Sequence, residues 1–287
     1  MNPNALNYIE QARQQLPQLS HATNILTKKK GKLTPAQKDA LDKLIDKYAE
    51  YLNVALSLND DNKARVVKLV ESLNSYYNFL HTYELDNVFT AQGKFRPTIL
   101  EEFLFLLFRN YVSDKIQEFD AEGILGSGAA KAYTNIYFKA RDFRDFIESP
   151  EIGINEKDQN FAIYRIFDIS INNATPLKIR IPAIAIEAKT YIDKTMLDSI
   201  IATAEKIKSG NPHTRFIAVA EKYDVSYGVD PAYSRIDQIY VLRKSMRKQW
   251  CNIDAEVVWR LFDETIQHLE RPWFDIEKKI AEDGVVI

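Results

Sequence analysis

The chain has a single cysteine, Cys251, among its 287 residues. One thiol cannot form an internal disulfide, and it cannot build a zinc site that needs several cysteines. The histidines are equally few and show no metal-ligand spacing: His21, His81, His213 and His268. These shortages exclude a disulfide scaffold and a cysteine-rich zinc centre. We therefore expect an intracellular protein.

Long apolar runs are also missing. No stretch reaches the roughly 18 apolar residues that are typical of a membrane span. The first residues, MNPNALNYIEQARQQ, lack the apolar core of a secretory signal. The sequence therefore predicts a cytoplasmic protein with no membrane partner.

Glycine and proline are scarce, with 9 and 10 residues, whereas 46% of the chain is hydrophobic and 27% is charged. This composition is typical of an ordinary globular protein and excludes disordered and fibrous chains. The length allows one large domain or two modest ones. We expect a helical region over residues 1–85, for dimerisation or DNA recognition, and a catalytic domain over 86–287.

Neither sign of charge dominates, because the chain has 38 Lys and Arg and 40 Asp and Glu, for a net charge of -2. A strongly basic chain would indicate a nucleic-acid partner, and this chain is not basic. A local basic patch can still neutralise phosphates while the whole molecule stays near zero. The net charge therefore leaves the partner open.

The first third of the chain predicts helices from about residue 7 to 83, because apolar residues recur there at three- and four-residue spacing. Thr34 and Pro35 form a helix start signal. A second helix is expected after Pro97 in ILEEFLFLLFRNYV, which is apolar around most of its circumference and so predicted to be buried. Its acidic pair, Glu101 and Glu102, can be explained by the helix dipole alone, because acids are favoured in the first turn of a helix.

The second half alternates between strand and helix signals. Two strand-like runs, 160–170 and 178–192, flank a polar turn and predict a hairpin. An amphipathic helix that ends at Gly210 follows, then the strands RFIAVAE and RIDQIYVLR, and then a helix over 254–268. This order predicts an α/β core with a mixed sheet.

Each of two basic clusters can be interpreted either as a DNA contact or as an ordinary structural element. The stretch TNIYFKARDFRDFIESP mixes cations with aromatic residues, which suits a surface facing DNA but equally suits a strand followed by an amphipathic helix. A second cluster follows the last predicted strand and fits phosphate contact or a solvated turn equally well. The candidate DNA-binding residues are Lys139, Arg141, Arg144, Arg243 and Arg247.

The segment PAIAIEAK, residues 182–189, carries the chemistry. Side chains alternate across a strand, so Ile184, Ile186 and Ala188 share one face. Glu187 and Lys189 lie side by side on the other face, at the end of an otherwise apolar strand. Phosphodiester hydrolysis uses this combination, because carboxylates hold Mg²⁺ and a nearby cation offsets the developing negative charge.

Such a site needs a second carboxylate from the preceding strand, for which Asp158 and Asp168 are candidates. An E-x-K pair alone is more typical of a surface ion pair. Asp168 is also better explained as a solvated strand residue. The residues themselves therefore leave a nuclease and a surface ion pair both open.

Several longer blocks are more specific. The E-x-K arrangement resembles the catalytic half of the PD-(D/E)XK nucleases, and an ordered set of blocks resembles the subunits of BbvCI-type restriction endonucleases. These blocks are 97–108, 147–161, 181–198, 202–221 and 236–247. The resemblance implies a PD-(D/E)XK core, with a mixed central sheet flanked by helices, and a helical N-terminal extension.

The resemblance also implies an activity and partners. The expected protein is a Mg²⁺-dependent type II restriction endonuclease subunit that hydrolyses double-stranded DNA at a short specific sequence. It would act as a homodimer or as a heterodimer with a related subunit. By the same resemblance, Glu187 is a metal ligand, Lys189 is the catalytic lysine, and Glu102 reaches the site as an additional acid.

The chain departs from the family pattern at one position. The other metal-binding acid is expected immediately before Phe161, where this sequence has Asn160. Asparagine keeps the shape but removes the negative charge that a hard cation prefers. Three interpretations follow: Asn160 is a natural or engineered inactivating replacement, Asp158 has taken over as metal ligand, or the alignment is shifted by two residues. We favour the first interpretation. The alternative to an endonuclease subunit is a catalytically silent subunit that retains the nuclease fold for DNA recognition or for binding a partner.

Overall fold

The N-terminal region is a set of helices, as the periodic apolar residues predicted. The structure is a computed structural model of the chain, and it describes residues 3–85, 88–89, 95–170, 176–226, 229–245, 250–271, 273 and 276–284. Thr34 caps the third helix in a reciprocal pair of hydrogen bonds with Gln37. The first four helices are α1 (Pro3–Gln15), α2 (Ser20–Lys30), α3 (Pro35–Ser57) and α4 (Lys63–Thr82).

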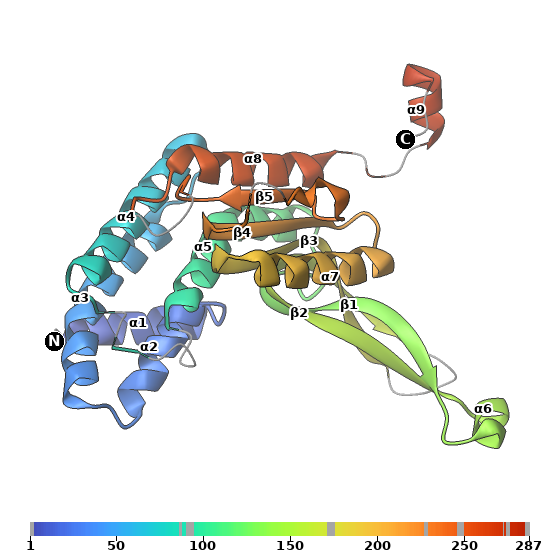
Figure 1. Cartoon of the computed structure of the whole chain (residues 1–287), viewed down its shortest axis with the longest axis horizontal. Coiled ribbons are helices and arrows are strands. Elements are labelled where there is room, and N and C mark those ends of the chain that lie inside the picture. Colours follow the sequence, from blue (N-terminus) through green and yellow to red (C-terminus); the bar gives the residue numbers. More distant parts are fainter. Residues whose placement is uncertain are drawn as a thin grey trace.

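The long helix α5 (Phe95–Glu118) is buried around most of its circumference. It begins two residues before Pro97, and the prediction of a start after the proline was therefore wrong. Proline is tolerated there because the first-turn N–H groups of a helix have no partner within it. The helix α5 contacts α2 and α4 on one side and the strands β1, β2 and β3 on the other, so it lies between the N-terminal helices and the sheet (Figure 1).

The sheet is mixed, as predicted. Its strands follow one another in the order β1-β2-β3-β4-β5, with antiparallel pairing from β1 to β3 and parallel pairing from β3 to β5. The parallel step from β3 to β4 runs through the helix α7 (Lys194–Gly210). The strands are β1 (Leu125–Lys139), β2 (Glu151–Ile169), β3 (Leu177–Ile192), β4 (Arg215–Tyr223) and β5 (Gln238–Val241).

The strand β5 is shorter than the run RIDQIYVLR predicted. Before it, the Asp237 carboxylate accepts hydrogen bonds from the Phe216 backbone and from Lys208, which holds this residue in a loop. After it, Lys244 adopts a positive φ of 45°, a conformation that is uncommon outside glycine and that ends the strand.

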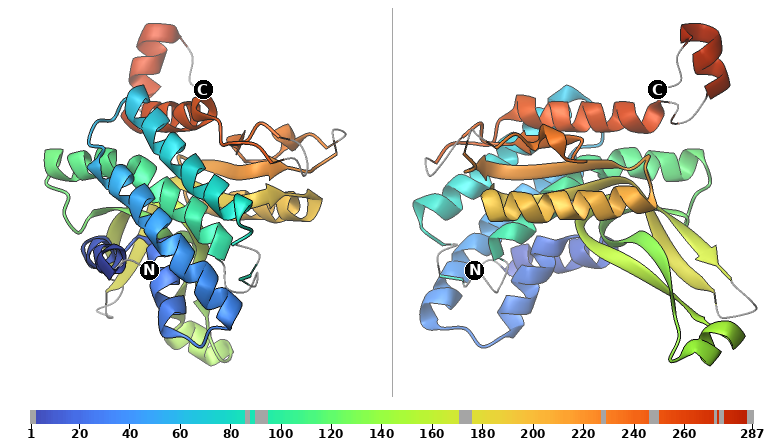
Figure 2. Two further views of the ribbon diagram at one scale, coloured as in Figure 1. Left: turned by 90° about the vertical axis from the view of Figure 1, so that its left-hand side faces the viewer. Right: turned by 45° about the vertical axis from the view of Figure 1, so that its right-hand side comes forward.

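Helices cover both faces of the sheet (Figures 1 and 2). One face packs on α7, where Ala185 belongs to a small core together with Ala218 and Ile200. The other face packs on α5 and on α8 (Ala255–Glu270), in a larger core that includes Ile184, Ile186 and Ala188. The predicted alternation along β3 is therefore confirmed.

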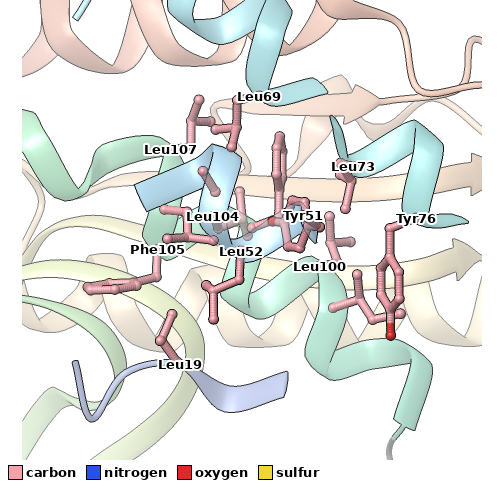
Figure 3. Packing of buried hydrophobic residues seen from close by; sticks show 14 of the residues in the cluster. Leu19, Tyr51, Leu52, Leu69, Leu73, Tyr76, Leu100, Leu104, Phe105 and Leu107 are labelled. Carbon is pink, nitrogen blue, oxygen red and sulfur yellow. The ribbon is translucent and has the colours of Figure 1, made fainter. Parts of the chain in front are cut away.

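The larger core continues without a break from the N-terminal helices to α8. Figure 3 shows Leu52, Leu69, Leu73 and Leu104 packed together between α3, α4 and α5. Each such side chain contributes roughly 1.5–3 kcal/mol when fully buried. The predicted regions 1–85 and 86–287 thus share one core, and the N-terminal helices hold α5 in place against the sheet.

The strands β1 and β2 continue beyond the sheet as an arm (Figures 1 and 2). They stay paired as far as Lys139 and Glu151, and the short helix α6 (Phe143–Glu148) closes the tip. The remaining elements, which the sequence did not predict, are the 3-10 turn Pro231–Tyr233 and the helix α9 (Ile276–Asp283). Within the described residues, no helix is long and apolar enough to cross a membrane.

Candidate active site

The sheet divides at Asn160, Glu187 and Lys189, which the sequence identified as candidate site residues. We call this place the fork. The strand β2 pairs with β3 from the Phe161–Ile186 pair onward, and its earlier residues pair with β1 in the arm. The strand β3 meanwhile continues beside β4, with Glu187 opposite Ala218. The β2–β3 ladder therefore ends beside the E-x-K pair.

A β-bulge shapes the fork on the β2 side. Between the pairs Gly128–Ala162 and Ala130–Gln159, the two residues Asn160 and Phe161 lie opposite a single residue of β1. A bulge breaks the regular alternation and redirects a side chain. Phe161 stays fully buried in the larger core, while Asn160 is directed toward α5 and β3.

Asn160 joins these two elements through both ends of its amide. Its Nδ2 donates a hydrogen bond of 2.8 Å to Oε1 of Glu101 on α5. Its Oδ1 accepts a hydrogen bond of 2.9 Å from the backbone N–H of Ala188 on β3. The structure therefore places Asn160 between Glu101 and the strand that carries Glu187 and Lys189.

Glu187 and Lys189 lie side by side, as expected for alternate residues of one strand. Nζ of Lys189 is 2.7 Å from Oε1 of Glu187. The side chain of Lys189 is 31% exposed and that of Glu187 is 15% exposed. The pair is partly withdrawn from water, so each charge is stabilised by the other more strongly than on an open surface. A carboxylate and an ammonium thus remain together at the fork, within reach of solvent.

Glu102 does not reach this site, and the prediction that it does was wrong. Its carboxylate is 1% exposed and accepts hydrogen bonds from the backbone N–H groups of His21 and Ala22 and from the hydroxyl of Tyr48. Burial raises the pKa of Glu102 to about 7, although these hydrogen bonds lower it in part. Glu102 therefore joins α5 to the N-terminal helices, and its neighbour Glu101 is the acid at the fork.

Asp158 lies on the arm, where it is exposed and opposite Lys131. It precedes the bulge by two residues, whereas Asn160 contacts the backbone between Glu187 and Lys189. This placement favours Asn160, rather than Asp158, as the residue at the position of the family acid.

The donor atoms at the fork do not make a complete Mg²⁺ site. Carboxylate oxygens are the ligands that Mg²⁺ prefers, and Glu101 and Glu187 are acids on the two elements that Asn160 joins. Asn160, however, directs amide hydrogens at Glu101 and uses its oxygen on Ala188. In the part of the chain that the structure describes, no group of three or more His, Cys, Asp or Glu side chains is arranged to hold a metal ion.

Three of the predicted DNA-binding cations lie at the tip of the arm. Lys139, Arg141 and Arg144 are exposed, and they pair with Glu151, Asp145 and Glu148, respectively. Residues 139–151 contain these three cations and four acids, Asp142 being the fourth, so the tip carries a net charge of 3 − 4 = −1. A role for these cations in DNA binding remains a prediction.

Arg243 is not on the surface, and its predicted contact with phosphate was wrong. Its side chain is 0% exposed, and its Nε donates a hydrogen bond of 2.8 Å to Glu221. The guanidinium also lies over the rings of Trp250 and Tyr77. Arg243 is thus a buried structural cation, and Arg247 lies outside the described residues.

The buried acid Glu221 is a residue that the strand pattern indicates. Glu221 is the one acid in the apolar strand run RFIAVAE, and its side chain is 1% exposed. A buried carboxylate in such a strand requires cationic or hydrogen-bonding partners, which Arg96 and Arg243 provide here.

A mixed sheet that forks at a carboxylate–lysine pair, with helices on both faces, is the architecture that the resemblance to PD-(D/E)XK nucleases implied. The family model for the Bpu10I restriction endonuclease matches residues 92–267. The chain therefore belongs to the Bpu10I restriction endonuclease family.

A solved structure confirms the fold and the resemblance to BbvCI-type subunits. A chain of the native BbvCI A2B2 tetramer is similar to this one with a TM-score of 0.68 and 21% sequence identity, over 88% of this chain and 96% of that chain. No curated protein matches the sequence.

Proposed function

We propose that this chain is a subunit of a type II restriction endonuclease that binds double-stranded DNA. We further propose that Asn160 impairs the hydrolytic site of this chain. The family match and the fork geometry support the first part. The observation that carries the second part is the placement of the Asn160 amide between Glu101 and the backbone of Ala188.

Each residue at the fork has a place in phosphodiester hydrolysis. Lys189 is an ammonium beside the reacting phosphate, where it offsets the negative charge that develops in the transition state. Glu187 holds that ammonium at 2.7 Å and provides one anionic ligand for a cation. If Mg²⁺ bound at the fork, Glu187 and Glu101 would hold it, and the ion would supply polarisation of the phosphate and activation of a water molecule. Because Asn160 is neutral, the site as it stands lacks one of the negative charges that favour the cation.

The active form is expected to contain two subunits, since one site hydrolyses one DNA strand. The chain would form a homodimer or a heterodimer with a related subunit. If only this chain is impaired, a heterodimer that contains it nicks supercoiled plasmid. Full conversion of plasmid to the linear form by a purified mixed dimer would remove this claim.

The second candidate function is a silent subunit that recognises DNA or binds the partner without contributing to hydrolysis. The hydrogen bonds of Asn160 favour it, because they form a self-contained link between α5 and β3 that needs no metal ion. The charge at position 160 distinguishes the two functions. Cleavage by an Asn160→Asp variant supports an impaired nuclease, whereas DNA binding without cleavage by this variant supports the silent subunit.

A further inference from the structure

A pocket of about 440 Å³ lies where the strands β3 and β4 end. Thr190 and Tyr191 line it and directly follow the lysine of the E-x-K pair. Tyr191 lies opposite Lys222 of β4 in the parallel ladder. We call this cavity the strand-end pocket, and its lining is His81, Arg96, Thr190, Tyr191, Lys222, Asp224 and Trp250.

The strand-end pocket borders the fork through two elements that also carry the candidate site. Lys189 and Tyr191 are alternate residues on one face of β3, about 7 Å apart along the strand. Arg96 lies in the first turn of α5, five residues before Glu101. A DNA strand rises about 3.4 Å per nucleotide. A strand whose phosphate lies at Lys189 therefore reaches the pocket within about two nucleotides.

The pocket borders a buried acid, Glu221, which pairs with two arginines. Below it, Glu221 is bound by Nη2 of Arg96 at 3.1 Å and by Nε of Arg243 at 2.8 Å, and it also accepts from the hydroxyl of Tyr77. One carboxylate thus faces two guanidinium groups. The lining itself carries the cations Arg96 and Lys222 and the acid Asp224.

Lys222, the second cation of the lining, is partly withdrawn from water. Burial lowers the pKa of Lys222, and the neighbouring Arg243 and Arg96 lower it further. A cation that is partly withdrawn from water attracts a phosphate more strongly than a cation on an open surface, because solvent screens it less.

Aromatic rings complete the pocket. The Trp250 ring stacks on His81 at 4.1 Å between centroids and with 10° between the planes, and the Arg96 guanidinium lies over Trp250 at 5.4 Å. Tyr191 remains 45% exposed. Cations that track phosphates, together with aromatic faces that pack on bases or sugars, are typical of grooves that hold one strand of nucleic acid.

We propose that the strand-end pocket binds a nucleotide of the DNA strand next to the phosphate held at Lys189. Lys222 and Arg96 pair with its phosphate, and Tyr191 packs against its sugar or base. This inference rests on the proposed function, because it takes DNA as the substrate.

The test is the binding of the full chain to a fluorescently labelled DNA duplex of mixed sequence, without divalent metal, at several NaCl concentrations. Lys222→Ala is expected to weaken binding by about 5- to 10-fold and to lower the slope of log affinity against log salt by about one. Tyr191→Ala is expected to weaken binding without changing that slope. Lys43→Ala, which removes an exposed lysine of α3, is the matched control and should leave both quantities unchanged.

The outcomes separate this inference from the proposed function. If the unaltered chain binds DNA and both pocket variants bind with unchanged affinity and salt slope, the pocket assignment is wrong and the proposed function stands. If the unaltered chain shows no salt-dependent DNA binding, the proposed function fails and the pocket assignment with it. Lys222→Gln keeps much of the side-chain volume and replaces Lys222→Ala if circular dichroism shows that the alanine variant does not fold.

Discussion

Asn160 donates a hydrogen bond of 2.8 Å from its amide nitrogen to the carboxylate of Glu101. The two residues come from β2 and α5, and they meet because a bulge redirects Asn160 from the strand alternation. An aspartate at this position would keep the acceptor for Ala188 but would oppose the Glu101 carboxylate. Two carboxylates at this separation cannot both stay ionised unless a cation lies between them. The contact with Glu101 is therefore stable with asparagine at position 160. With aspartate there, it is stable only when a cation binds between the two carboxylates.

The two neighbouring glutamates of α5 should differ in function. In an Asn160→Asp background, Glu101→Gln is expected to lower the rate of plasmid nicking by about 100-fold or more, because it removes a charge at the site. Glu102→Gln in the same background should change the rate by less than about 3-fold, because Glu102 bonds to the N-terminal helices. Equal losses in the two variants would show that the assignment of Glu101 to the site is wrong.

Glu102 should also make stability depend on pH. Its pKa is about 7 in the folded chain against 4.5 for the ordinary group, so between these values the folded state binds more protons than the unfolded state. Stability from this residue therefore falls as pH rises from 4.5 to 7, by about 3 kcal/mol.

Glu102→Gln removes this dependence and can keep the hydrogen bonds, since its oxygen can accept from the two backbone N–H groups and its nitrogen can donate to Tyr48. Urea unfolding of both proteins at pH 4.5 and 7.5 should show the glutamine variant gaining about 3 kcal/mol relative to the parent over this range. Burial lowers the pKa of His21 to about 3, which opposes the trend in both proteins and largely cancels from the difference. A difference that is independent of pH would contradict this account.

Glu221 should be a strong determinant of stability. Replacement by alanine leaves the guanidinium groups of Arg96 and Arg243 without their shared carboxylate, one of them fully buried. The expected loss is about 3–5 kcal/mol in the free energy of unfolding. Glu256→Ala, at an exposed acid that pairs with Lys63, should cost less than about 1 kcal/mol in the same urea experiment. Similar losses in the two variants would contradict the buried network.

The cations at the arm tip give a separate prediction for DNA binding. Their ion pairs are exposed and so contribute little to stability, which means that a phosphate can replace their acidic partners. The double variant Arg141→Ala, Arg144→Ala should lower the salt slope of duplex binding by about 2 and leave the thermal midpoint unchanged. An unchanged slope would leave the arm without a role in binding phosphate.

Much of the fold could be predicted because it depends on periodicity. The spacing of apolar residues is enough to locate the helices, and the alternation along β3 is enough to place Glu187 beside Lys189. The choice between Glu101 and Glu102 could not be made, since α5 is buried on nearly all sides and its apolar pattern has no polar face to orient it. The burial of Arg243 was equally hidden, because its partner Glu221 comes from another strand.

The central claim is that Asn160 occupies the position of a metal-binding acid and impairs hydrolysis. Its most direct test is the cleavage of supercoiled plasmid with Mg²⁺ by the chain as it stands and by its Asn160→Asp variant, at equal concentrations. The account predicts that the aspartate variant cleaves and that the parent chain is at least about 100-fold slower. Equal cleavage by the two proteins would contradict it and would show that Asp158 or another acid supplies the missing charge.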